Sequence, residues 1–239
     1  MSTAPPQTSP RRWLPLVIRV LVVGIAFLLV LPYAVAPLYR VVDPVSTLML
    51  WRWAKRARVE RMVVPIDRIA PILPRTVLAA EDERFCSHHG IDFGELRRAV
   101  KAETDGVRRP RGGSSITQQL AKNLFLWPGR SYARKALELP LALWIDFVIP
   151  KRRQLEIYLN IAEWGPNGEF GAEAGARRAF GKPADVLSAV EAALLTATLP
   201  NPIRRNARQP SPALHRLAAT YMARAASGTN IDRCIRPTL

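Results

Sequence analysis

The 239-residue sequence predicts a mainly α-helical protein with one helix that spans a membrane. Hydrophobic residues make up 49% of the chain, which is enough to form a buried core. Helix-capping residues recur along the sequence, whereas segments with strict polar and apolar alternation are few. A run of 20 uncharged residues near the N-terminus matches the thickness of the hydrocarbon core of a bilayer.

The composition excludes several other classes of protein. Two cysteines, Cys86 and Cys234, are too few for a small fold held together by disulfides. Charged residues make up 23% of the chain and are widely spread, which argues against many membrane spans. The net charge of +16 predicts an anionic partner, such as nucleic acid, a phosphorylated ligand or a lipid surface.

The N-terminal segment predicts a membrane anchor. Residues 1–19 are expected to form an N-terminal tail that carries Arg11, Arg12 and Arg19, and residues 20–39 to form the transmembrane helix. Arginines precede the uncharged run, so the positive-inside rule places the tail in the cytoplasm and the rest of the chain outside. A cleavable signal peptide is the alternative, because Ala34-Val35-Ala36 resembles a cleavage site. We favour the uncleaved anchor, because the run exceeds a signal core of roughly 7–15 residues and Pro37 follows the site directly.

Residues 40–64 are predicted to form a membrane-proximal connector. Trp51 and Trp53 lie there among Arg and Lys residues, a composition that suits the lipid headgroup zone. The sequence leaves open the alternative that both tryptophans pack in the core. Residues 63–66 are the best candidate for a short β-strand.

Capping residues and apolar periodicity predict helices in the remainder, with a main domain over residues 65–205 and a basic C-terminal helix and tail over residues 206–239. Asp92 with Glu95 and Ser131 are candidate helix starts, and Pro140 is a candidate kink. The helices are expected over residues 92–101, 116–126, 131 onward, 151–164, 185–199 and 211–228.

Polar side chains cluster within this domain at residues 81–90, 112–123, 134–138 and 151–160. Arg134 and Glu138 are four residues apart and share a helix face, as do Glu156 and Asn160. Two separate carboxylates, Glu81 and Glu138, stand among many cations. Such a set suits glycosyl chemistry, in which a carboxylate moves a proton and other groups stabilise developing charge.

Other kinds of site fit these clusters less well. His88 and His89 are adjacent, so their side chains point in different directions, and no second ligand cluster accompanies them as a zinc site requires. The turn at residues 112–115 lacks the Gly-Lys-Ser/Thr of a phosphate-binding P-loop and the Gly-x-Ser-x-Gly of many serine hydrolases. Spacing alone therefore indicates an acid/base enzyme without identifying its reaction.

Taken together, the clusters resemble the five motifs of the peptidoglycan glycosyltransferases (glycosyltransferase family 51). The resemblance covers roughly residues 65–205, and the motifs are E-D-x-x-F-x-x-H-x-G at 81–90, G-S-S-I-T-Q-Q at 113–119, R-K-x-x-E at 134–138, K-x-x-x-L-E-x-Y-L-N at 151–160 and the stretch 171–182. Ser115 stands where the family usually has Thr, Gln154 where Ile is usual and Ala179 where an aromatic residue is usual. These departures leave both carboxylates in place.

The resemblance implies a lysozyme-like, two-lobed helical domain that polymerises lipid II into β-1,4-linked glycan strands, with inversion and release of undecaprenyl pyrophosphate. It implies that Glu81 is the general base and Glu138 the second essential carboxylate. The residues expected to bind substrate come from the motifs and from the loop between the second and third: Asp82, Phe85, His88, Gly90, Ser114, Ser115, Gln118, Gln119, Lys122, Asn123, Arg130, Arg134, Lys135, Glu156, Tyr158, Asn160 and Lys182. The candidates to stabilise the pyrophosphate are Lys122, Arg130, Arg134, Lys135 and Lys182.

Cofactors, partners and location follow from the same resemblance. The motifs identify no metal ligands, although a divalent cation, Mg²⁺ or Mn²⁺, at the pyrophosphate is a candidate. The expected partners are lipid II, the growing glycan strand, membrane lipid and other cell-wall synthesis proteins. Nucleic acid is not expected, because the basic domain lies outside the cytoplasm. The predicted location is the bacterial inner membrane, with a single pass, a cytoplasmic N-terminus and a periplasmic domain.

Some family members also carry a transpeptidase, but this chain has no Ser-x-x-Lys and no Lys-Thr-Gly and resembles the monofunctional members. A membrane-anchored, lysozyme-like enzyme that cleaves glycans is the alternative function. A membrane-anchored binding protein that uses its basic surface is a second alternative, and it would need neither carboxylate. Cys86 and Cys234 lie in a compartment that permits a disulfide, although the sequence does not give their distance.

Overall fold

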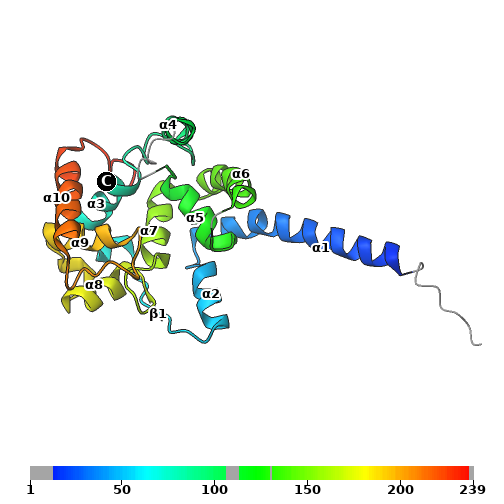
Figure 1. The fold of residues 1–239 in the computed structure, drawn as a ribbon, viewed down its shortest axis with the longest axis horizontal. Helices are drawn as coiled ribbons and strands as arrows, with labels where there is room; N and C mark the ends of the chain where they lie inside the picture. Colours follow the sequence, from blue (N-terminus) through cyan, green and yellow to red (C-terminus); the bar gives the residue numbers. More distant parts are fainter. Residues whose placement is uncertain (1–12, 106–112, 130, 237–239) are drawn as a thin grey trace, which may run out of the picture.

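The computed structural model describes residues 13–105, 113–129 and 131–236. The chain is mainly helical, as predicted, and one long helix extends away from a body of packed helices (Figure 1). This helix, α1 (Leu14–Val35), continues into a 3₁₀-helix, η2 (Ala36–Arg40), at the edge of the body.

Residues 14–40 form the one stretch in the described part of the chain that is long and apolar enough to cross a membrane. No residue of α1 is buried against the protein. The helix begins six residues before the predicted start at residue 20, because Arg19 lies inside the helix and Pro15 fits its first turn. Its α-helical part ends at Val35, and the tighter helix η2 completes the predicted segment.

The end of the anchor is attached firmly to the body. Trp144 Nε1 donates a hydrogen bond of 2.9 Å to the carbonyl of Tyr33. Arg153 Nε donates another of 2.9 Å to the carbonyl of Tyr39, whose ring stacks on Phe125. These contacts fix the direction in which α1 leaves the body.

The connector contains a short helix, α2 (Thr47–Ala54), which the side chain of Ser46 caps. Met49 is buried, whereas Trp51 and Trp53 are 49% and 48% exposed. The alternative in which both tryptophans pack in the core is therefore wrong.

The predicted strand at residues 63–66 is also wrong. Strand β1 (Glu60–Arg61) lies just before it and pairs in parallel with β2 (Glu169–Phe170). The backbone of Val64 is held by a side chain, because Asn160 Oδ1 accepts from Val64 N and Asn160 Nδ2 donates to Val64 O. An amide side chain thus takes the place of a neighbouring strand.

Helices of the body fall into two packed groups. On the side next to α1, α5 packs against α6 and α7, and on the far side α9 and α10 pack against α3 (Figure 1). The body contains α3 (Ile72–Glu81), α4 (Phe93–Thr104), α5 (Ile116–Phe125), α6 (Tyr132–Val148), α7 (Lys151–Ile161), α8 (Ala172–Phe180), α9 (Ala189–Thr198) and α10 (Pro212–Ser227), with 3₁₀-helices η3 (Ile66–Arg68) and η4 (Ala184–Val186) between them.

Side-chain caps determine where most of these helices begin. Ser131 and Ser211 accept backbone hydrogen bonds at the starts of α6 and α10, as predicted. Ser188 forms a reciprocal capping box with Glu191, so α9 starts at residue 189 and not at 185. Helix α7 ends at Ile161, three residues early, because Ala162 adopts an extended conformation.

A disulfide joins Cys86 to Cys234, with their Cα atoms 5.4 Å apart and a sequence separation of 148. It connects the turn after α3 to the segment after α10. The C-terminal end of the chain is therefore tied to the first of the sequence motifs.

Candidate active site

Glu81 is the last residue of α3 and faces a cleft of about 630 Å³. The helix ends there because Asp82 adopts a non-helical conformation, with φ −162°. The cleft is lined by residues 79–84, 86 and 87, by Asp92 and the start of α4, by Ser114 and Ser115, and by the end of α10 with the segment after it. The carboxylate thus lies where a helix end opens onto a cavity large enough for a sugar.

Asp82 joins the first motif to the second. Its carboxylate contacts His88 Nε2 at 2.9 Å and accepts a hydrogen bond of 2.9 Å from the backbone N–H of Ile116. The second contact places a negative charge at the N-terminus of α5, where a helix dipole favours it. Ser115 Oγ adds a hydrogen bond to the carbonyl of Gly90. The two motifs therefore form one rigid unit around Glu81.

Gln119 and Tyr158 orient the Glu81 carboxylate. Gln119 Nε2 donates a hydrogen bond of 2.9 Å to Glu81 Oε2, and the Tyr158 hydroxyl donates one of 3.1 Å to Gln119 Oε1. Burial raises the pKa of the Glu81 carboxyl, although the hydrogen bond from Gln119 and the charge of Lys122 oppose that rise. The result is a positioned carboxyl group with a raised pKa beside a cleft.

Glu138 lies at the centre of a cationic cluster on α6. It is 2% exposed and contacts Arg134 Nη1 at 2.9 Å and Lys135 Nζ at 2.5 Å. Lys135 Nζ also donates a hydrogen bond of 2.8 Å to Ser114 Oγ, and Ser114 lines the cleft. Both Glu138 oxygens therefore hold a cation, and one of these cations, Lys135, reaches Ser114 in the cleft wall.

Lys122 stands between this cluster and Glu81. It lies one helical turn beyond Gln119 on α5, so both side chains share a face. Burial lowers the pKa of its ammonium group; the Glu138 carboxylate opposes this, and Arg134 lowers the pKa further. Within the described residues Lys122 makes no ion pair, so its charge is available to a ligand.

Four of the predicted substrate-binding residues make contacts that support the fold. Phe85 is fully buried in the core, so it has no surface to offer a substrate. Gly90 has a φ of +75°, and a Cβ there would lie 2.5 Å from the carbonyl oxygen of Ala142. Glu156 and Asn160 hold the backbone of residues 64–66, because Glu156 Oε2 accepts from Ile66 N and Asn160 pairs with Val64. These four residues build the domain around the cleft.

Three other predicted residues, Gln118, Asn123 and Lys182, lie apart from the Glu138 cluster or engage the backbone. Gln118 forms the capping box of α5 with Ser115. Asn123 lies on α5, where its carbonyl accepts a hydrogen bond from Thr47. Lys182 forms an ion pair of 2.7 Å with Glu191 at the start of α9, and Arg130 lies outside the described residues.

Residues after position 200 that lie near Glu81 were not predicted from the sequence. Arg224, Asn230 and Arg233 line the cleft, and the charge of Arg205 lowers the pKa of Glu81. The cysteine pair and the arginine-rich C-terminal segment were the available signals. Neither shows that this segment folds back beside Glu81.

The chain is similar in sequence to known proteins over most of its length. The transglycosylase family matches residues 49–226. A biosynthetic peptidoglycan transglycosylase of Rhodopseudomonas palustris (strain TIE-1) is 62% identical over 209 residues, which are 87% of this chain and 88% of the relative. Relatives with the same name in Nitrobacter hamburgensis and Rhizobium johnstonii are 60% and 47% identical, over 87% and 94% of this chain and 92% and 93% of their own lengths. The chain therefore belongs to the biosynthetic peptidoglycan transglycosylases, which are monofunctional members of the transglycosylase family.

Proposed function

We propose that this peptidoglycan glycosyltransferase joins lipid II units into β-1,4-linked glycan strands, with inversion at the anomeric carbon and release of undecaprenyl pyrophosphate. The observation that carries the proposal is the Glu81 carboxyl group, which Gln119 holds beside the cleft and whose pKa burial raises. The relatives' shared description as biosynthetic enzymes supports synthesis over cleavage.

In this mechanism Glu81 acts as the general base. Its carboxylate takes the proton from the 4-hydroxyl of the acceptor sugar while that oxygen attacks the anomeric carbon of the donor. The bond to the pyrophosphate oxygen breaks on the opposite face, so an α-linked donor gives a β-linked product. A raised pKa suits the role, because a stronger base accepts a proton more readily near neutral pH.

The cations next to Glu81 would stabilise the leaving pyrophosphate. Lys122, Arg134 and Lys135 combine positive charge with full or partial burial, and Lys135 connects the group to the cleft through Ser114. Negative charge grows on the phosphate oxygens as the bond breaks, and fixed cations in a poorly hydrated site stabilise such charge strongly. Glu138 is then a positioning residue that keeps Arg134 and Lys135 aligned.

The residues around this cluster do not suit a divalent cation. Both Glu138 oxygens already contact cations. The described part of the chain holds no group of three His, Cys, Asp or Glu side chains arranged to bind a metal.

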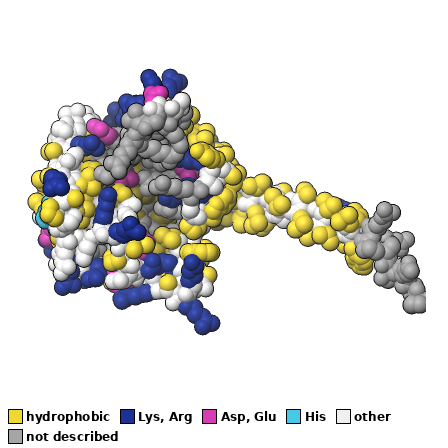
Figure 2. All heavy atoms as spheres, viewed as in Figure 1, with side chains coloured by type: hydrophobic (Ala, Val, Ile, Leu, Met, Phe, Trp, Pro, Cys, Tyr) yellow, Lys and Arg dark blue, Asp and Glu magenta, His cyan; other side chains and the backbone are white. Residues whose placement is uncertain are grey.

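The anchor places the cleft near its lipid-linked substrate. The apolar surface of α1 continues onto the adjoining part of the body (Figure 2). Four exposed aromatic side chains favour the lipid headgroup zone: Trp51, Trp53, Trp127 and Phe147. The proposed topology keeps the N-terminus in the cytoplasm and the body in the periplasm, an oxidising compartment that suits the disulfide.

The test is a reaction of the full-length protein with lipid II, followed by gel separation of the products. We expect long glycan polymers and no soluble sugar from isolated cell-wall sacculi. Release of soluble fragments from sacculi, without polymer from lipid II, would establish the glycan-cleaving alternative instead.

A further inference from the structure

The wall of the cleft formed by residues 224–233 carries charges that the proposed mechanism does not use. Arg224, at the end of α10, and Arg233, next to the disulfide, both line the cleft and are exposed. Within the described residues neither guanidinium forms an ion pair within 4.0 Å. The other lining arginines are paired, Arg84 with Asp92 and Arg98 with Glu95.

This wall is held in a fixed position relative to Glu81. Arg75, on the same helix as Glu81, donates hydrogen bonds of 2.7 Å to the carbonyls of Ala225 and Gly228. It also contacts Asp232 at 3.3 Å. Two contacts with Cys86 fix the segment at residues 233 and 234. Cys234 forms the disulfide with Cys86, and Arg233 Nη2 donates a hydrogen bond to the carbonyl of Cys86. A segment held at so many points can present charges to a ligand without first becoming ordered.

We infer that Arg224 and Arg233 form a subsite that binds a carboxylate of the peptide attached to the substrate's sugar. The inference rests on the proposed function, since lipid II carries a pentapeptide and every linear peptide ends in a carboxylate. A guanidinium group matches a carboxylate in charge and in planar geometry, and their hydrogen bonds are among the stronger ones in proteins.

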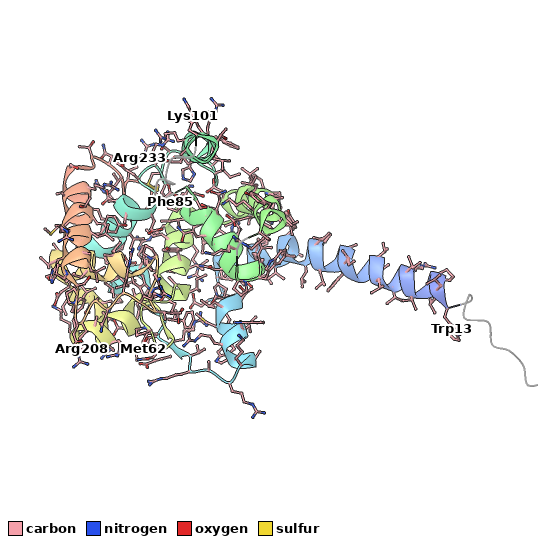
Figure 3. All side chains as sticks on the ribbon, viewed as in Figure 1. Trp13, Met62, Phe85, Lys101, Arg208 and Arg233 are labelled. Atoms are coloured by element: carbon pink, nitrogen blue, oxygen red, sulfur yellow. A yellow bond between two sulfur atoms is a disulfide. The ribbon has the colours of Figure 1, made fainter. Side chains whose placement is uncertain are left out.

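The position of the subsite favours a carboxylate over a lipid phosphate. The lipid phosphates stay at the membrane surface, on the side of the molecule from which α1 leaves. Arg233 lies beyond α5 on the side of the body away from α1 (Figure 3). The cluster around Glu138 lies on α6, which contacts α1. Cations for the phosphates and cations for the peptide therefore occupy different ends of the site.

The experiment compares two substrates with the full-length enzyme in detergent. One is lipid II with free peptide carboxylates, and the other is the same lipid with those carboxylates converted to amides. Arg224→Ala and Arg233→Ala should each raise KM for the free form about tenfold with little change in kcat, as expected for a lost charge-assisted hydrogen bond. Neither variant should change KM for the amidated form. The unaltered enzyme should already bind that form weakly.

The matched control is Arg208→Ala. Arg208 is an exposed arginine of the same C-terminal region that lies at the opposite end of the body from Arg233 (Figure 3). It should leave KM for both substrates unchanged. An equal rise in KM on both substrates would overturn the inference in favour of phosphate binding, and an unchanged KM on both would overturn it outright. Failure of the unaltered enzyme to polymerise lipid II would instead refute the proposed function.

A second experiment tests whether Arg224 binds the substrate or only offsets the charge of a neighbouring acid. Glu83 is an exposed acid that also lines the cleft. In a Glu83→Gln background, the effect of Arg224→Ala on KM should persist at its full size. Loss of that effect would show that the arginine only offsets the charge of Glu83, because the two substitutions would then be coupled.

Discussion

Gln119 Nε2 donates a hydrogen bond of 2.9 Å to Oε2 of Glu81. Tyr158 fixes the orientation of the Gln119 amide by donating to its oxygen. The amide group therefore stabilises the charged form of the carboxyl group and opposes the effect of burial on its pKa. This chain of two hydrogen bonds orients the Glu81 carboxylate and limits the rise in its pKa that burial causes.

Replacing Gln119 with Leu should shift the pH dependence of polymerisation. Without the donor the pKa of Glu81 rises further, so a larger fraction of the base is protonated at a given pH. The acid limb of kcat/KM should therefore move to higher pH, and activity should be lost mainly on the acid side. A uniform loss at all pH values, measured with lipid II, would contradict the assignment of Gln119 to the base.

Replacing Glu138 with Gln should reduce both stability and activity. Arg134 and Lys135 would lose their shared carboxylate, and breaking a buried ion pair from one side costs about 3–5 kcal/mol. Urea unfolding should show a drop of that order, and kcat should fall because the cations lose their alignment. Glu60→Gln is the control: its pair with Arg58 is exposed and should contribute less than about 1 kcal/mol. Equal stability losses in the two variants would argue against the positioning role.

Removal of the disulfide by Cys86→Ser with Cys234→Ser should lower the free energy of unfolding by about 2–5 kcal/mol, because it closes a loop of 148 residues. The freed C-terminal segment should also weaken binding of lipid II. Thermal unfolding with and without a reducing agent measures the first effect, and KM for lipid II measures the second. The double variant should no longer respond to the reducing agent. An unaltered protein whose unfolding is the same under both conditions would contradict the pairing.

Truncation of the anchor should separate tethering from catalysis. Deletion of residues 1–31 removes most of α1 but keeps the contacts of Tyr33 and Tyr39 with the body. The truncated protein should keep its unfolding temperature. Its activity on lipid II in vesicles should fall about ten- to hundredfold, because tethering raises the effective concentration of enzyme and substrate. Its activity on soluble short-chain analogues should change little, and equal losses on both substrates would contradict this role of α1.

Local sequence signals predicted much of the helical framework. Ser131 and Ser211 mark helix starts because their side chains satisfy backbone N–H groups that lack a partner in the helix. The same reasoning failed at residues 63–66. There the extended backbone depends on Asn160, which lies 96 residues away, and no local pattern shows such a partner.

The site was predictable where its residues form motifs and not where the fold brings separate segments together. Glu81, Gln119 and the Glu138 cluster are recognised from their motifs. In the structure Glu81 lines the cleft, Gln119 holds Glu81, and Lys135 connects the cluster to Ser114 in the cleft wall. Phe85 belongs to the same motif, yet it is a core residue. Arg224 and Arg233 reach the cleft only through long-range contacts with Arg75 and Cys86. A motif therefore identifies a set of residues without separating those that touch substrate from those that support them.

The most direct test of the account is the rate at which the Glu81→Gln variant polymerises lipid II. The amide keeps the shape of the side chain but does not accept the proton, so we expect a loss of about 10²–10⁴-fold in kcat with an unchanged unfolding temperature. Asp185→Asn, at an exposed acid in η4, is the matched control and should keep full activity. Near-normal turnover by a folded Glu81→Gln variant would contradict the role of Glu81 as the general base.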